Sequence, residues 1–182
     1  MKIPKYFRKM SGITRGSPPR VNNTEIMWSW TGAFLGTAAV AWVNRLFFSG
    51  TDLSLMIGAF GASAVLVYGT VRSPLAQPRN LIGGHMLPAI VGVTCWKLFH
   101  QHPWLAEAMA VSIATALMHI TRTLHPPGGA TALIAVIGSP SIHKLGYWYV
   151  LMPATMGPLI LLVVALLINN IPASRRYPEI WF

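Results

Sequence analysis

Hydrophobic positions along the chain fall into six long blocks that short polar segments separate, and no block holds more than one charged residue. A helix needs about 20 such residues to cross the ~30 Å hydrocarbon core of a bilayer. Five blocks meet this length, whereas the sixth is too short to cross unless it is tilted or shielded by protein. The pattern predicts an all-α, polytopic transmembrane helical bundle of five full spans plus one short or broken helix. The five long blocks are residues 26–48, 53–71, 81–99, 104–120 and 147–170, and the short one is 127–138.

Composition agrees with this pattern. Only 10% of the 182 residues are charged, 53% are hydrophobic, and the mean hydropathy is +0.51. Soluble domains carry about 25% charged residues, so a soluble enzyme is excluded. Disorder is excluded as well, because disordered segments are poor in apolar residues. The single cysteine, Cys95, cannot form an internal disulfide and argues against a cysteine-based metal site.

The distribution of charge predicts the orientation. The net charge is +10, from 14 basic and four acidic residues. If all six blocks cross the membrane and the N-terminus is cytoplasmic, only Arg45, Lys97 and Lys144 lie outside, in accord with the positive-inside rule. We therefore expect a multi-pass protein of the cell's inner (plasma) membrane with both termini cytoplasmic. If 127–138 is instead re-entrant, the C-terminus lies outside.

The chain divides into three regions. Residues 1–25 form a basic, cytoplasmic N-terminal tail, which we expect to lie on anionic membrane lipid rather than on nucleic acid. Residues 26–170 form the transmembrane domain. Residues 171–182 form a short C-terminal tail with Tyr177 and Trp181 at headgroup depth.

Small residues at helical spacing predict close helix packing in several blocks. Gly32 and Gly36 form such a pair, and Ala106, Ala110 and Ala114 form a longer stripe. We interpret these faces as contacts within one chain, with a homo-oligomer through the same small-residue faces as the alternative.

Two similar loops, which we call elbows, carry the candidate chemistry. The first elbow covers 72–85 and the second covers 122–130. Each begins with an arginine, places a polar residue before a proline, and runs through Gly-Gly into an apolar block. The likeness suggests an internal repeat of about 50 residues, and many transporters place their substrate site between such repeats.

The second elbow has the parts of a small-anion site. Pro126 and Pro127 suit the first turn of a helix, where a missing N–H has no partner to lose. The backbone N–H groups of Gly128, Gly129 and Ala130 are then expected to be free at a positive helix end, where anions bind. Arg122 and His125 stand beside them, and the first elbow supplies Gln77, Arg79, Asn80 and His85 in matching places.

Other functions are weighed against this one. The first alternative is that the elbows are surface turns whose arginines bind lipid headgroups, which would make the protein a non-transporting scaffold or sensor. Haem or a metal would need facing histidines such as His85 and His119, but no carboxylate lies nearby to orient them, so we expect no cofactor and no metal. Glu107 is either a rim residue near Lys97 or an intramembrane proton relay.

The sequence around His125-Pro126-Pro127, together with Ser73-Pro-Leu-Ala-Gln-Pro-Arg-Asn80 and the Gly-Gly-His that follows, resembles the HPP family of integral membrane proteins. The resemblance covers roughly residues 25–170. It implies a domain of four transmembrane helices, and some members in plastids and cyanobacteria are linked to nitrite transport. The expected function is therefore a transporter or channel for a small inorganic anion, nitrite first, and not an enzyme.

Overall fold

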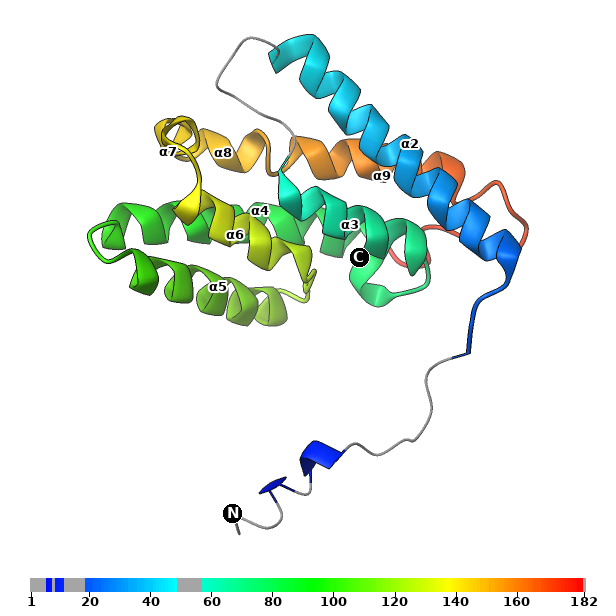
Figure 1. Cartoon of the computed structure of the whole chain (residues 1–182), viewed down its shortest axis with the longest axis horizontal. Helices are drawn as coiled ribbons and strands as arrows, with labels where there is room; N and C mark the ends of the chain where they lie inside the picture. Colours follow the sequence, from blue (N-terminus) through cyan, green and yellow to red (C-terminus); the bar gives the residue numbers. More distant parts are fainter. Residues whose placement is uncertain (1–5, 8, 12–18, 49–56, 182) are drawn as a thin grey trace.

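The computed structural model describes residues 6–7, 9–11, 19–48 and 57–181. Its elements in these ranges are all helices, which confirms the all-α prediction (Figure 1). A short 3-10 turn, η1, covers Lys9–Ser11, and a second one, η2, covers Pro74–Ala76. The α-helices are α2 (Asn23–Phe48), α3 (Gly58–Gly69), α4 (Pro78–Phe99), α5 (Pro103–Ile120), α6 (Pro127–Ile137), α7 (Pro140–Leu145), α8 (Trp148–Leu151) and α9 (Met156–Ile168).

Four of the segments are long and apolar enough to cross a membrane: α2, α4, α5 and the stretch Trp148–Ile168. The expected full span over 53–71 is not confirmed, because α3 begins only at Gly58 and residues 49–56 lie outside the described ranges. Helix α6, with 11 residues, is the short helix that the pattern predicted. Two short apolar helices thus accompany four long segments, and this number of long segments matches the number that the family resemblance implied.

The last long segment is not one continuous helix. The chain leaves the helical path between α8 and α9, at Met152–Thr155. Proline explains the break, because Pro153 has no N–H and its ring clashes with the preceding turn. The hydrophobic pattern of 147–170 contains no sign of this break other than the proline itself.

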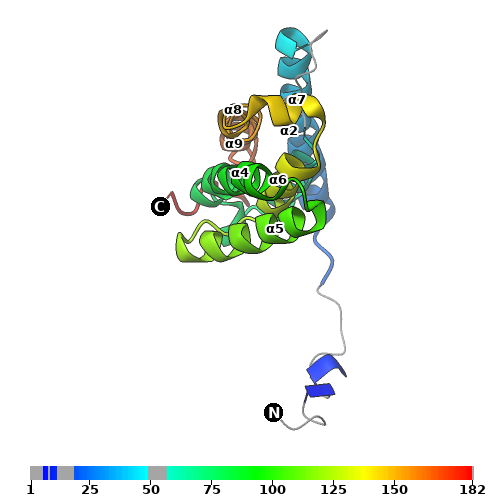
Figure 2. The same ribbon diagram turned by 90° about the vertical axis from the view of Figure 1, so that its left-hand side faces the viewer.

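Helices α3, α4, α5 and α6 and the α8–α9 segment run in alternate directions roughly along one axis, and α2 crosses them at an angle (Figure 1). Figure 2, turned by 90°, shows α4 and α6 between α5 on one side and α8, α9 and α2 on the other. The beginning of α2 and the end of α9 lie at the same end of the bundle. The elbows lie where α4 and α6 begin, on the side from which α2 starts.

Small residues are used for packing within the chain, as predicted. A Cβ atom on Gly32 would lie 2.6 Å from the ring of Tyr68, and one on Gly36 would overlap the same side chain. The alanine stripe of α5 is fully buried against α4 and α6. These faces are therefore occupied by the chain's own residues, and the homo-oligomer stays a prediction.

Candidate functional site

The first elbow is a single 3-10 turn followed at once by a helix. The hydroxyl of Ser73 accepts a hydrogen bond from the backbone N–H of Leu75, which caps η2. Gln77 has an extended backbone (φ −72°, ψ 157°), and Pro78 then occupies the first position of α4. The proline prevents the helix from extending backward, so Arg79 and Asn80 stand in its first turn.

The second elbow contains an unusual backbone conformation. The N–H of Thr123 bonds to the carbonyl of Met118 at 2.9 Å, and that of Arg122 bonds to His119 at 3.2 Å. This is the pattern of a Schellman ending, whose left-handed position is generally glycine. Here Arg122 occupies it with φ +57°, the one positive φ of a non-glycine residue in the described part of the chain.

The two elbows dock against each other. Arg79 donates from Nη2 to the carbonyl of Thr121 at 2.7 Å, and Asn80 donates from Nδ2 to that of Leu124 at 2.8 Å. A Cβ on Gly84 would overlap the side chain of His125, so glycine permits the close approach. The two elbows, whose contacting residues are about 40 positions apart in the sequence, therefore form one continuous structure.

Docking brings four of the predicted site residues to a single cavity of 120 Å³, which we call the basic pocket. Two arginines from different elbows face it. Neither guanidinium has a carboxylate within 4.0 Å among the described residues. The lining residues are Pro74, Gln77, Arg79, Asn80, Arg122, Ile180 and Trp181.

Gln77, predicted as a ligand, is already fully bonded. Its Nε2 donates to the carbonyls of Val71 and Ser73, and its Oε1 accepts from the backbone N–H of Glu179 at 2.9 Å. The side chain therefore holds the C-terminal tail against the first elbow. Gln77 positions the wall of the basic pocket.

The C-terminal tail differs from the expected surface segment. Tyr177 is only 2% exposed and donates its hydroxyl to the carbonyl of Ala76 at 2.8 Å. Burial raises the pKa of the Tyr177 phenol, so the group stays a neutral donor. The tail folds back over the first elbow and brings Trp181 to the basic pocket.

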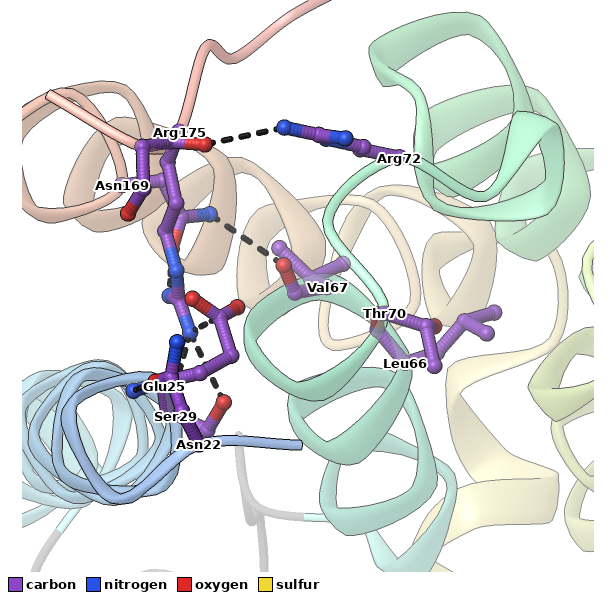
Figure 3. Close-up of polar contacts among 10 residues, drawn as sticks. Asn22, Glu25, Ser29, Leu66, Val67, Thr70, Arg72, Asn169 and Arg175 are labelled. Atoms are coloured by element: carbon purple, nitrogen blue, oxygen red, sulfur yellow. Dashed lines mark hydrogen bonds and ion pairs between the residues drawn. The ribbon is translucent and has the colours of Figure 1, made fainter. Parts of the chain in front are cut away.

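A buried ion pair fixes this tail to the start of α2 (Figure 3). The Nη2 of Arg175 lies 2.7 Å from a carboxylate oxygen of Glu25 and 2.8 Å from the hydroxyl of Ser29. Its Nη1 donates to Asn169 Oδ1 at 3.1 Å. A buried guanidinium needs such partners, because an unpaired charge in the interior is strongly destabilising.

The prediction of free backbone donors at the second elbow is wrong for two residues. The N–H of Gly128 bonds to the carbonyl of His125 at 2.8 Å, and that of Gly129 bonds to Pro126 at 3.0 Å. Pro126 is itself helical (φ −50°, ψ −39°), so the first turn consumes these donors. A Cβ on Gly128 would overlap the backbone oxygen of Gly84, which gives this glycine a packing role instead. Of the neighbours, Pro127 is buried, whereas Pro126 and Ala130 are exposed.

The two predicted histidines meet in the interior rather than in the basic pocket. His85 Nε2 lies 2.7 Å and His125 Nε2 lies 2.9 Å from the hydroxyl of Ser63 on α3. His85 Nδ1 lies 2.6 Å from the hydroxyl of Thr131, and His125 Nδ1 lies 2.8 Å from the carbonyl of Leu75. We call Thr131, His85, Ser63 and His125 the histidine chain; all four are 0% exposed.

One carbonyl sets the direction of every hydrogen bond in the histidine chain. The oxygen of Leu75 can only accept, so His125 carries its hydrogen on Nδ1 and, when neutral, accepts on Nε2. The Ser63 hydroxyl also lies 3.2 Å from the carbonyl of Ala59, but it donates its one hydrogen to His125, whose Nε2 would otherwise have no donor. Ser63 accepts from Nε2–H of His85. The Nδ1 of His85 then accepts from the hydroxyl of Thr131.

Sequence reasoning missed Ser63, Thr131 and Trp181. Ser63 and Thr131 occupy apolar helices, where a small hydroxyl residue is read as a packing residue. One feature of the sequence pointed to them: a buried polar side chain requires a hydrogen-bond partner, and the two elbow histidines are such partners. His119, the other histidine considered for haem, is exposed on α5.

Comparisons with known proteins agree with the resemblance noted from the sequence. The family description that matches is "HPP, transmembrane region", over residues 18–178. Two transmembrane proteins of Dictyostelium discoideum are 39% and 41% identical to the chain, over 97% and 100% of its length. The chain spans only 57% and 65% of the lengths of these relatives. No solved structure matches. The chain therefore belongs to the HPP transmembrane family.

Proposed function

We propose that the protein is a transporter or channel for a small inorganic anion, with nitrite as the first candidate. The observation that carries the proposal is the convergence of Arg79 and Arg122 on the basic pocket. An anion that leaves water loses its hydration, and fixed positive charge offsets this loss. We propose that the ion passes without chemical conversion, so the protein is not an enzyme.

The shape and chemistry of the basic pocket favour a small planar ion. Its 120 Å³ is well below the range of about 300–1,000 Å³ of pockets that hold drug-sized ligands. A guanidinium is planar and donates two parallel hydrogen bonds to an oxyanion. Asn80 and the indole of Trp181 add polar and aromatic surface to the same wall.

The proposed orientation follows from the same end of the bundle. The elbows and the C-terminal tail bring Arg72, Arg79, Arg122, Arg175 and Arg176 to the side on which α2 begins. By the positive-inside rule, this side is cytoplasmic. The beginning of α2 and the end of α9 then both face the cytoplasm (Figure 1). We place the protein in the plasma membrane, with the basic pocket open to the cytoplasm.

The alternative is a scaffold or sensor whose elbow arginines bind lipid headgroups. The experiment that separates the two uses purified full chain in liposomes, with uptake measured for nitrite, nitrate, chloride and phosphate. We expect nitrite uptake above that of protein-free liposomes and of liposomes holding an unrelated membrane protein. Uptake at the protein-free level for all four ions would reject transport and favour the scaffold.

A further inference from the structure

The histidine chain links three helices through the interior, and the proposed anion pocket makes no use of it. Its members lie on α3, α4 and α6 and on the loop before α6, and successive members are 2.6 to 2.9 Å apart. A core that only needed packing would use apolar side chains, because a buried polar group is costly unless fully bonded. Four buried polar side chains linked one after another by hydrogen bonds therefore require an explanation beyond packing.

The histidine chain can take up one additional proton without losing a hydrogen bond. If a proton reaches the hydroxyl of Thr131, that residue passes its own hydrogen to Nδ1 of His85. His85 passes its Nε2 hydrogen to Ser63, and Ser63 passes its hydrogen to Nε2 of His125. Each donor loses one proton and gains one, except His125, which becomes an imidazolium.

The resulting arrangement is again fully bonded. His125 donates to both Leu75 and Ser63, and Ser63 now donates back to His85. The hydroxyl of Thr131 turns to the carbonyl of Pro127, 3.5 Å away. The positive charge has moved from α6 to the elbow, and the three hydrogen bonds between members of the chain remain, each with its direction reversed.

Each end of the histidine chain lies one step from a residue that lines a cavity, although neither Thr131 nor His125 lines a cavity itself. At one end, His125 bonds to η2, whose Pro74 lines the basic pocket. At the other end, one turn beyond Thr131, Ala135 lines a second cavity of 120 Å³ with Lys97 and His143. The two cavities lie at opposite ends of α4.

The surroundings contain few other titratable groups. Tyr149 of α8 donates its hydroxyl to the carbonyl of Thr131 at 3.0 Å, and Phe60 of α3 packs edge-on against His85. No carboxylate is bonded to the histidine chain in the described residues. Glu107, the relay residue considered from the sequence, lies on α5 and is not part of it.

We propose that the histidine chain conducts protons between the two ends of the bundle and couples proton movement to the anion. The coupling rests on the proposed anion transport, whereas the proton conduction itself does not. The pathway runs from the cavity beside Lys97 through Thr131, His85 and Ser63 to His125.

Water in the cavity beside Lys97 gives the proton to Thr131, and the His125 imidazolium gives its Nδ1 proton to water on the side of the basic pocket. This last transfer requires the bond from His125 Nδ1 to the Leu75 carbonyl to open, because a carbonyl oxygen does not pass a proton on. Rotation of the imidazole rings and hydroxyl groups then restores the first arrangement.

The test uses the full chain in liposomes that contain a pH-sensitive dye, with a potassium diffusion potential to drive protons inward. Ser63→Ala removes the central hydroxyl, and Ser63→Thr keeps one. Ser112→Ala is the matched control, because the hydroxyl of Ser112 bonds only to a carbonyl of its own helix. Thermal unfolding of each protein in detergent shows whether it is folded.

We expect Ser63→Ala to lower proton flux by at least about tenfold, since a gap in a buried hydrogen-bonded chain leaves its neighbours unpaired. Ser63→Thr should retain most of the flux, and Ser112→Ala should match the wild type. If Ser63→Ala unfolds, Thr131→Val against Thr131→Ser gives the same comparison. Wild-type proton flux no greater than that of protein-free liposomes, or full flux in folded Ser63→Ala, would overturn the proposal.

A second readout separates the histidine chain from the basic pocket. Exchange of labelled nitrite at equal pH needs only anion passage, whereas accumulation driven by a pH gradient needs coupling. Ser63→Ala should keep the exchange and lose the accumulation, a split that general loss of structure would not produce. Proton flux without nitrite exchange in the wild type would reject the proposed function while supporting proton conduction.

Discussion

At the scale of single residues, Arg122 is the most informative position. It occupies the left-handed end of α5 with φ +57°, where glycine avoids the steric cost that an L side chain incurs. Strained backbone of this kind persists where the surrounding structure imposes it, and it concentrates at functional sites. Arg122 lines the basic pocket, which is a reason for keeping a side chain there.

Replacement of Arg122 by glycine should therefore separate stability from function. We expect the unfolding free energy to stay the same or rise by up to about 1 kcal/mol, because the left-handed strain disappears. Nitrite uptake should fall, because one of the two charges of the pocket is lost. Thermal unfolding and liposome uptake measure the two effects on one preparation. A clear loss of stability with normal uptake would mean that Arg122 serves the fold.

At the scale of elements, the close packing of α4 against α6 requires glycine at position 128 but not at position 129. Gly128 lies against the backbone of Gly84, whereas a Cβ on Gly129 would meet only Val111, at 3.9 Å. The pair tests whether these glycines pack helices or present backbone donors to an ion.

We expect Gly128→Ala to lower stability by about 1–3 kcal/mol, the usual cost of overpacking. Gly129→Ala should keep or raise stability by up to about 1 kcal/mol, since alanine favours a helix. Both effects are measured as shifts in thermal unfolding, with uptake assayed in parallel. If Gly129→Ala is fully stable but has lost uptake, the anion site lies at the beginning of α6, as the sequence predicted.

The elements also show what a single sequence can and cannot predict. Hydrophobic length predicted α2, α4 and α5 because each is a continuous apolar helix. The prediction is not confirmed for 53–71, where residues 53–56 lie outside the described ranges, and it missed the break at Pro153. The elbows were predicted from Pro and Gly, but the pairing of Gly84 with His125 was not, because sequence spacing does not encode contact between distant loops.

The candidate site was likewise predicted only in part from the sequence. Arg79, Asn80 and Arg122 were predicted and do share a cavity, because charged groups in an apolar chain are conspicuous. Ser63 was missed, since a small hydroxyl on an apolar helix resembles a packing residue until its partners are known. The free N–H groups of Gly128 and Gly129 were wrongly predicted, because Pro126, the residue before α6, is already helical and both N–H groups bond to the carbonyls of the preceding turn.

At the scale of the whole molecule, the ion pair of Arg175 and Glu25 joins the C-terminal tail to the first turn of α2. We expect Glu25→Gln to lower stability by about 1–3 kcal/mol, less than for a fully buried pair because Glu25 is partly exposed. The loosened tail should be cut sooner by protease near Trp181. Limited proteolysis measures this, with Glu107→Gln as the control for loss of one acid. Equal cleavage rates would show that the pair does not hold the tail.

Orientation is also a property of the whole chain. With Cys95 replaced by Ser, single cysteines at positions 141 and 174 should differ in reactivity. Ser141→Cys, in α7, should react with an impermeant thiol reagent added to intact cells, and Ser174→Cys should react only after permeabilisation. The opposite pattern would place the basic pocket outside the cell.

The central claim is that the two elbow arginines bind the transported anion, and initial nitrite uptake by the purified chain in liposomes tests it most directly. Arg79→Lys and Arg122→Lys keep the charge but lose the planar fork, so we expect partial uptake with a raised KM. Arg79→Gln and Arg122→Gln should reduce uptake nearly to the protein-free level. Arg176→Gln removes an equal charge from an exposed position at the same end and should match the wild type. Wild-type uptake that stays unaltered in both elbow glutamine variants would contradict the account.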